Sequence, residues 1–363
     1  MVILKRKILF LLALTLLFAC STRRELFVEY SNSQIVYSGR IDSSIVKGVE
    51  LYWSGTSIKL NFEGESIAAL IEDEKGDNYY NIKIDNDSLF ILRPDTTKRY
   101  YQLASKLPKG KHTVEIFKRT NWDRGKTSFY GFKIQGKPKV LTKRSPYKRK
   151  IEFYGNSITE GYAVEDTSGR DSPDSTYTNN YLSYAAITAR HFNADYQCVC
   201  KSGIGVTISW FPLTMPEMFD RLIPTDSTSK WDFSLYSPDI VVINLFQNDS
   251  WLANMPDRAE FKMNFGNKTP NEEYFINAYQ KFVADIRNHY PNTNIICMLG
   301  NMDATKEGSK WMSYIKKAVT NLNDKNIYNH FIPFKDTQGH PSIKEQEEMS
   351  NSLIQFIDEN IDW

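Results

Sequence analysis

Residues 151–161 read IEFYGNSITEG, a short apolar strand that stops at a glycine and then presents Ser157. Further segments with the length and composition of strands follow at 196–200, 239–246 and 294–299. Helical segments lie between them, and the most regular one, at 272–288, forms a single apolar stripe of Phe275, Tyr279, Phe282 and Ile286. Because strands and helices alternate, we expect residues 151–363 to form a three-layer α/β domain with a mostly parallel sheet.

In the part of the chain before residue 137, apolar residues recur with a different period. From 31 to 136 turn-forming residues recur every eight to twelve residues or so. Between them apolar and polar residues alternate, as in 112–117. This pattern predicts an all-β, jelly-roll-like sandwich domain over residues 31–136. Residues 137–150 are rich in proline and basic side chains and offer little to bury, so we interpret them as a linker.

The first twenty residues have the features of an export signal. Three basic residues, 5–7, precede an apolar run from Ile8 to Phe18, and a small residue, Ala19, stands before Cys20. This end resembles a bacterial lipobox, in which the cysteine becomes the lipidated first residue of the exported protein. A secretory peptide cut near Ala19 is the alternative, but we favour a lipoprotein anchored through Cys20 to a membrane, in the periplasm or at the cell surface.

Charge and cysteine content exclude several classes of protein. Without the signal the chain has 42 basic and 43 acidic residues, a formal charge of −1, so we expect no nucleic-acid partner. Cys198, Cys200 and Cys297 remain, and an odd number cannot form a complete set of disulfides. No histidine or further cysteine near residues 198–200 supports a metal site. We expect three buried thiols and no cofactor.

A serine hydroxyl needs a base before it can act as a nucleophile. The chain has five histidines, and four lie in ordinary positions: one in a sandwich strand, two near helix ends, and His330 in a polar connection. His340 differs, because Gly339 permits a close approach and Pro341 favours a first helical turn, which would fix the imidazole above the sheet. Ser157 and His340 are therefore the candidate nucleophile and base.

Four sequence blocks now carry a family resemblance: 155–159 around Ser157, 202–205 (SGIG), 247–249 (QND) and 339–341 (GHP). Their order resembles that of the SGNH (GDSL-like) hydrolases. The front half, with YWSG at 52–55 and FYGF at 129–132, resembles the β-sandwich that precedes the SGNH domain in carbohydrate esterase family 2.

This resemblance implies specific roles in an SGNH hydrolase domain over residues 151–363. Ser157 matches the nucleophile and His340 the base, while the N–H groups of Ser157 and Gly205 and the amide of Asn248 match the oxyanion donors. Gly203 is an alternative to Gly205. The family's acid usually lies three residues before the histidine, where this chain has Thr337, so either Asp336 completes a triad or the site works as a Ser-His dyad.

Other side chains are expected to shape the cleft. Trp251, Tyr162 and Trp210 are candidates for a sugar-binding surface, and simple packing is the alternative for each. Phe246 replaces a glycine that is common in the asparagine block, which would narrow the pocket in favour of a small acyl group. Long polar loops at 164–176 and 252–270 are expected to form cleft walls.

The resemblance implies an exported serine esterase that removes O-acetyl groups from polysaccharides or oligosaccharides of the acetylxylan or acetylglucomannan type. Two other functions remain open. One is a carbohydrate-binding lipoprotein without activity, and the other is an esterase or thioesterase acting on lipid or small acyl substrates.

Overall fold

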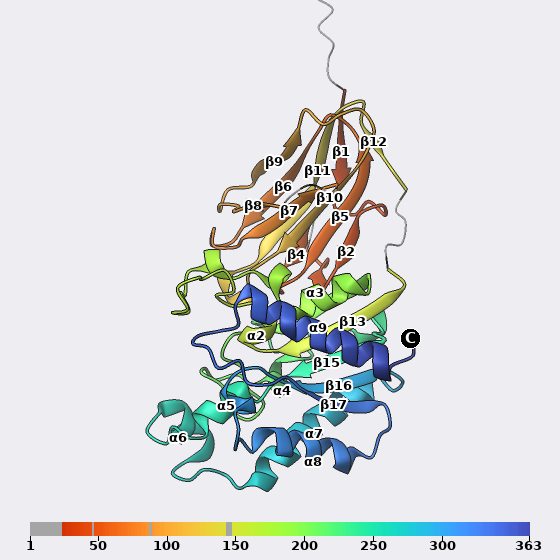
Figure 1. Cartoon of the computed structure of the whole chain (residues 1–363). Coiled ribbons are helices and arrows are strands. Elements are labelled where there is room, and N and C mark those ends of the chain that lie inside the picture. Colours follow the sequence, from red (N-terminus) through yellow and green to blue (C-terminus); the bar gives the residue numbers. More distant parts are fainter. Residues whose placement is uncertain (1–23, 46, 86, 88, 143–146) are drawn as a thin grey trace, which may run out of the picture.

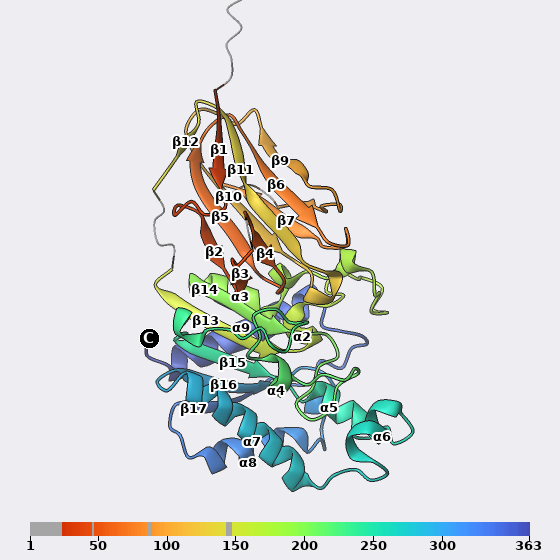
Figure 2. The same ribbon diagram turned by 180° about the vertical axis from the view of Figure 1, so that it is seen from behind.

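The computed structural model describes residues 24–45, 47–85, 87, 89–142 and 147–363. Figures 1 and 2 show two stacked units, a β-sandwich from the first part of the chain and a layered α/β unit from the rest. This architecture confirms the fold class expected from the sequence. The expected signal peptide and Cys20 lie outside the described residues.

The β-sandwich consists of two antiparallel sheets. One has the order β3-β4-β11-β6-β9, with β1 also paired to β11, and the other has the order β12-β5-β10-β7-β8, with β2 also paired to β5. The strands of the first sheet are β1 (Arg24–Glu29), β3 (Ile41–Asp42), β4 (Val49–Leu51), β6 (Ser66–Asp73), β9 (Arg99–Ser105) and β11 (Thr127–Gly136). Those of the second are β2 (Val36–Ser38), β5 (Ser57–Glu63), β7 (Tyr80–Ile84), β8 (Phe90–Leu92), β10 (Lys111–Lys118) and β12 (Lys139–Val140).

Alternation along the strands produces the sandwich core. In β5, Ile58, Leu60 and Phe62 are buried while Lys59 and Asn61 between them are partly exposed. Since successive side chains point to opposite faces, one face of each sheet packs against the other sheet. Within the segment expected as a linker, β12 pairs with β5.

The second unit is built on a parallel sheet of order β14-β13-β15-β16-β17. Four of its strands match expected ones, and the fifth was not expected, because it lies at the sheet edge, is mostly only partly buried and includes Asn329 and His330 among its five residues. His330 therefore lies in an edge strand and not in a connection. The strands are β13 (Arg149–Gly155), β14 (Ala194–Cys200), β15 (Ile240–Asn244), β16 (Asn294–Leu299) and β17 (Ile327–Phe331).

Helices cover both faces of this sheet (Figures 1 and 2). Ile240 and Val242 of β15 pack with α3 (Tyr184–His191) and α9 (Ile343–Asn360). Val241 and Ile243 of the same strand pack on the other face with α7 (Glu272–His289) and α8 (Trp311–Leu322). The shorter helices are α2 (Ser157–Glu160), α4 (Met215–Met218), α5 (Gln247–Leu252) and α6 (Ala259–Phe265), and single 3-10 turns are η2 (Trp122–Arg124), η3 (Ser175–Tyr177), η4 (Asn180–Leu182), η5 (Phe233–Leu235) and η6 (Asp303–Thr305).

The two units are joined by buried polar contacts. Arg40 of the sandwich forms an ion pair with Glu152 of β13 at 2.8 Å, and both side chains are almost fully buried. The guanidinium also donates to the carbonyl oxygen of Phe219 at 2.6 Å, and the indole of Trp53 donates to the carbonyl oxygen of Leu222 at 2.8 Å. These contacts hold the sandwich against the α/β unit in one fixed orientation.

Cys198, Cys200 and Cys297 are free and buried, as expected. Burial raises the pKa of the Cys297 thiol to about 12, so this group is an unreactive part of the core. Within the described ranges we find no cluster of metal-binding side chains. The same part of the chain contains no helix with the length and apolar character that a membrane crossing requires.

Candidate active site

Ser157 lies at the carboxyl end of β13, where the chain turns sharply into α2. Asn156 begins the helix, and its side-chain oxygen accepts a hydrogen bond from the N–H of Ile158 at 3.0 Å. Gly155 is required by this turn, since a Cβ there would lie 2.0 Å from the hydroxyl of Thr159. The Ser157 side chain is thereby fixed at the edge of the sheet where ligands bind in α/β folds.

His340 lies within hydrogen-bonding reach of this serine. Its Nε2 is 2.7 Å from Ser157 Oγ. Ser342 and Glu345 form a capping box that starts α9 immediately after the histidine. The ring of Tyr162 packs edge-on against the imidazole, with centroids 4.9 Å apart. Ser157 and His340, the nucleophile and base expected from the sequence, thus lie in direct contact.

The carboxylate beside His340 is Asp171. Its Oδ2 is 2.8 Å from Nδ1 of the imidazole, and its Oδ1 accepts the backbone N–H of His340 at 2.7 Å. Burial alone would raise the pKa of Asp171, but its bonds to His340 outweigh burial and lower that pKa. Gly339 permits this approach, because a Cβ there would lie 2.8 Å from Asp171 Oδ1.

The expectation for Asp336 is therefore corrected. Asp336 is exposed in a left-handed conformation (φ +51°), on a turn where Lys335 Nζ binds the carbonyl oxygens of Thr337 and Gln338. The turn directs the chain toward His340 without bringing the Asp336 carboxylate to it. Sequence reasoning missed Asp171, and its only signal was the long polar loop at 164–176, which was expected as a cleft wall.

The expectation for Gly205 is also corrected. Its backbone N–H donates to Ser209 Oγ at 2.9 Å, so this group is already occupied. Gly203 has φ +83°, which favours glycine, and lies in a turn closed by the N–H of Ile204 and the carbonyl oxygen of Lys201. Among the described residues, the N–H groups of Ser157 and Gly203 have no hydrogen-bond acceptor. Both N–H groups are therefore free to bind an oxyanion.

Asn248 is held in a fixed orientation on α5. Its Nδ2 donates to the carbonyl oxygen of Ile204 at 2.8 Å, and its Oδ1 accepts the indole N–H of Trp210 at 3.0 Å. An amide nitrogen carries two hydrogens, so one remains for a third group. Asp249, next in the chain, is fully buried and accepts the N–H groups of Val206 and Thr207. Its carboxylate therefore connects the segment that follows Gly203 and Gly205 to α5.

The three aromatic candidates have different positions. Tyr162 contacts His340 and Trp210 binds Asn248, so both belong to the site. Trp251 donates to Asp303 at 2.9 Å and lines a cavity of about 690 Å³ whose walls include neither Ser157 nor His340.

The expectation that Phe246 narrows the pocket is wrong. Its backbone has φ +84°, and the ring is buried against Tyr279 and Trp311 of the core. The side chain points into the packing between the sheet and α7, so it does not restrict the acyl group.

The site thus has a nucleophile, a base and a carboxylate that binds the base, together with amide hydrogens on Ser157, Gly203 and Asn248 that are unpaired among the described residues. A histidine held in this way can accept the proton of a serine hydroxyl, and amide groups can stabilise the oxyanion that forms on attack at an ester carbonyl. This is the arrangement of an acyl-transfer site.

Comparisons with known proteins agree with this arrangement. Residues 37–143 match the family described as Carbohydrate esterase 2 N-terminal, and residues 153–346 match the GDSL-like Lipase/Acylhydrolase family. The chain is 34% identical over 345 residues to the cellulase/esterase CelE of Acetivibrio thermocellus, an alignment that covers 92% of the chain and 40% of that protein. The chain thus spans less than half of CelE.

Two further relatives are covered almost completely. An acetylxylan esterase / glucomannan deacetylase of Cellvibrio japonicus is 24% identical, with 95% of each protein aligned. The solved structure of a family two carbohydrate esterase from Clostridium thermocellum in complex with cellohexaose is 33% identical, with a TM-score of 0.79, and covers 90% of this chain and 98% of that one. The chain described here belongs to the GDSL-like hydrolases and, within them, to carbohydrate esterase family 2.

Proposed function

We propose that this protein is a serine esterase that removes O-acetyl groups from polysaccharides or oligosaccharides through an acyl-enzyme. The observation that carries the proposal is the chain of contacts from Ser157 through His340 to Asp171, at 2.7 Å and 2.8 Å. The names of the family 2 relatives support a carbohydrate ester as the substrate, of the acetylxylan or acetylglucomannan type.

In the first half of the proposed reaction, His340 Nε2 takes the proton of Ser157 as Oγ attacks the acetyl carbonyl. The N–H groups of Ser157 and Gly203 and the free hydrogen of Asn248 Nδ2 stabilise the oxyanion. Asp171 stabilises the imidazolium and holds the tautomer with the proton on Nδ1. His340 then gives its proton to the sugar oxygen, which leaves as an alcohol, and the acetyl group stays on Ser157.

In the second half, water replaces the sugar. His340 takes a proton from this water, which attacks the acetyl-serine and forms a second oxyanion at the same donors. Collapse returns the proton from His340 to Ser157 Oγ and releases acetate. No external oxidant, reductant or metal enters this balance.

Acetate release from acetylated xylan and acetylated glucomannan by the purified protein tests the proposal, together with nitrophenyl esters of increasing chain length. We expect activity on the acetylated polysaccharides, highest activity on the acetyl ester among the nitrophenyl substrates, and loss of nearly all activity in Ser157→Ala. A preference for long acyl chains would contradict the deacetylase, and full activity of Ser157→Ala would contradict the serine mechanism.

We also propose that the protein is exported and anchored through a lipid on Cys20. The support is the sequence of residues 1–20. Labelling of cells with a radioactive fatty acid should mark the wild-type protein and leave Cys20→Ser unlabelled. Export of a protein cleaved at another position, without label, would contradict the anchor.

A further inference from the structure

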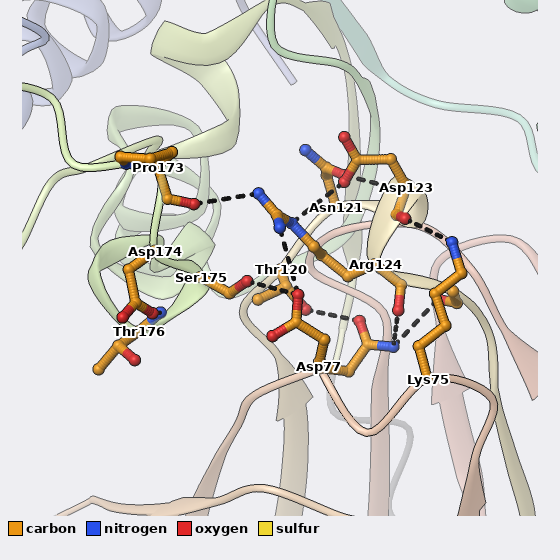
Figure 3. A network of polar contacts seen from close by, with 12 residues as sticks. Lys75, Asp77, Thr120, Asn121, Asp123, Arg124, Pro173, Asp174, Ser175 and Thr176 are labelled. Atoms are coloured by element: carbon orange, nitrogen blue, oxygen red, sulfur yellow. Dashed lines mark hydrogen bonds and ion pairs between the residues drawn. The ribbon is translucent and has the colours of Figure 1, made fainter. Parts of the chain in front are cut away.

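One turn of the β-sandwich lies against the segments that carry the active-site groups. It comprises Asn121 and η2, between β10 and β11, and Figure 3 shows the side chain of Arg124 reaching the loop around residues 173–176. We call residues 121–124 the sandwich turn. Its contacts suggest that the sandwich does more than frame the site.

Arg124 connects the sandwich turn to the loop of Asp171 (Figure 3). Its Nη2 donates to the carbonyl oxygen of Pro173 at 3.2 Å, and its Nη1 lies 3.2 Å from Asp77 Oδ2. The same Asp77 oxygen accepts the hydroxyl of Ser175 at 2.9 Å. Arg124 and Asp77 therefore hold the chain at two points, two and four residues after Asp171.

Other contacts fix the rest of this loop. The buried Arg119, which directly follows β10, donates to the carbonyl oxygen of Thr176 at 2.8 Å and pairs with Glu165 on the other arm of the loop. Within the loop, the N–H of Ser172 donates to Asp166 at 2.8 Å. The hydroxyl of Tyr162 also donates to the carbonyl oxygen of Asp171 at 3.4 Å. Among the contacts that come from the sandwich, that of Arg124 with Pro173 lies nearest to Asp171 in sequence.

Asn121 connects the sandwich turn to the other side of the site. Its Nδ2 donates to Glu160 Oε1 at 2.7 Å, and Glu160 Oε2 accepts the N–H and hydroxyl of Ser202 at 2.8 and 2.9 Å. Glu160 is on the same short helix as Ser157, and Ser202 precedes Gly203. Glu160 is only 1% exposed, so its carboxylate needs hydrogen-bond partners, and Asn121 is one of them. This carboxylate connects the helix of Ser157 to the loop that contains Gly203.

We propose that the sandwich turn is a positioning element of the active site, in which Arg124 holds Asp171 in line with His340 and Asn121 holds Glu160 and, through it, the Gly203 loop. This inference rests on the proposed esterase mechanism. Catalysis of this kind is sensitive to displacements of about 1 Å, so a carboxylate on a long loop needs anchors outside the loop. The planar fork of arginine suits two acceptors at once.

A double-mutant cycle separates positioning from other roles. We expect Arg124→Ala to lower kcat on nitrophenyl acetate about tenfold with KM nearly unchanged, since the loss corresponds to a loosened catalytic group. In the Asp171→Asn background the same substitution should have no further effect, because Arg124 acts through Asp171. Ser175→Ala, a smaller change to the same anchor, should cause a weaker loss that also disappears in that background.

Two further variants show whether the effect is specific to Arg124. Arg99 of β9 is also an arginine on the surface of the sandwich, but it pairs with Asp95 and packs on Tyr101, away from the sandwich turn, so Arg99→Ala should keep wild-type kcat. Asn121→Ala should lower kcat in both the wild-type and the Asp171→Asn background, because it acts on the oxyanion side.

Several results would overturn the inference. They are an unchanged kcat in both Arg124→Ala and Ser175→Ala, a loss that multiplies fully with that of Asp171→Asn, or a rise of KM alone, which would make Arg124 a substrate contact. Thermal unfolding of each variant identifies loss of fold, and if Arg124→Ala does not fold, the Ser175→Ala cycle decides. Ser157→Ala tests the proposed function separately: if it is inactive while Arg124→Ala is unimpaired, only the positioning role fails.

Discussion

Asp171 Oδ2 and His340 Nδ1 lie 2.8 Å apart, although the two residues are 169 positions apart in the chain. The carboxylate also accepts the backbone N–H of His340, so one side chain fixes both the ring and the loop that carries it. A carboxylate in this position stabilises the imidazolium that forms when serine loses its proton. This pair is the basis of the first prediction.

Replacing Asp171 by asparagine should reduce kcat by about 10²–10⁴, because an amide does not stabilise the imidazolium and can hold the wrong tautomer. Steady-state kinetics on nitrophenyl acetate measure the effect. Asp336→Asn is the matched control and should keep wild-type kcat, since Asp336 is exposed. A large loss in the control with a small one in Asp171→Asn would reverse the assignment.

Asn248 and Trp210 provide a second prediction. Asn248→Ala removes a proposed oxyanion donor and should lower kcat about 10²–10³-fold. Trp210→Phe removes the indole N–H that holds Asn248 Oδ1 while keeping an aromatic ring, and should cause a smaller loss, about tenfold, at similar KM. If Trp210→Phe raised KM and left kcat unchanged, Trp210 would be a substrate contact and not a support of the amide.

The stability of the protein should depend on pH through His330. Burial lowers the pKa of this imidazole to about 4, from an ordinary value of 6.5. Between these values the unfolded chain binds the proton more readily, so the contribution of His330 to stability is complete above pH 6.5 and is lost as the pH falls toward 4.

His330→Gln should therefore show a smaller drop in melting temperature between pH 7 and pH 5 than the wild type. The exposed His191 offers a control, and His191→Gln should leave the drop unchanged. Equal drops in the wild type and His330→Gln would show that another group is responsible.

The ion pair between Arg40 and Glu152 should be essential for docking of the sandwich. Glu152→Leu leaves a buried guanidinium without its partner and should lower the free energy of unfolding by about 3–5 kcal/mol, measured with urea. Adding Arg40→Met should recover part of this loss. The exposed pair Lys281–Asp285 is the control, and Lys281→Ala should have little effect. A negligible change in Glu152→Leu would contradict the role of the buried pair.

The sequence predicts most of this fold, because the spacing of apolar residues and the composition of each strand depend directly on how much of the strand is buried. The central strand β15 is apolar at every position except Asn244, and β5 alternates cleanly, so both are recognised without coordinates. The edge strand β17 was missed because a short, partly buried strand that includes Asn329 and His330 has neither signature. Ser157 and His340 were found because each stands in a compact motif next to a turn.

The rest of the site depends on tertiary contacts that leave no local pattern. Asp171 reaches His340 only because a long loop is folded back. The sequence of this loop does not indicate which part of the molecule it will contact. The choice between Gly203 and Gly205 depends on which N–H is already occupied by Ser209. The direction of the Phe246 ring follows from a left-handed backbone that the sequence does not indicate.

The most direct test of the account is identification of the residue that a fluorophosphonate modifies. Such reagents react with an activated serine, and mass spectrometry of the digested protein locates the adduct. The account predicts one adduct, on Ser157, formed together with loss of acetate release from acetylated xylan, and much slower labelling of His340→Ala. Inactivation with Ser157 unmodified, or with the adduct on another residue, would contradict it.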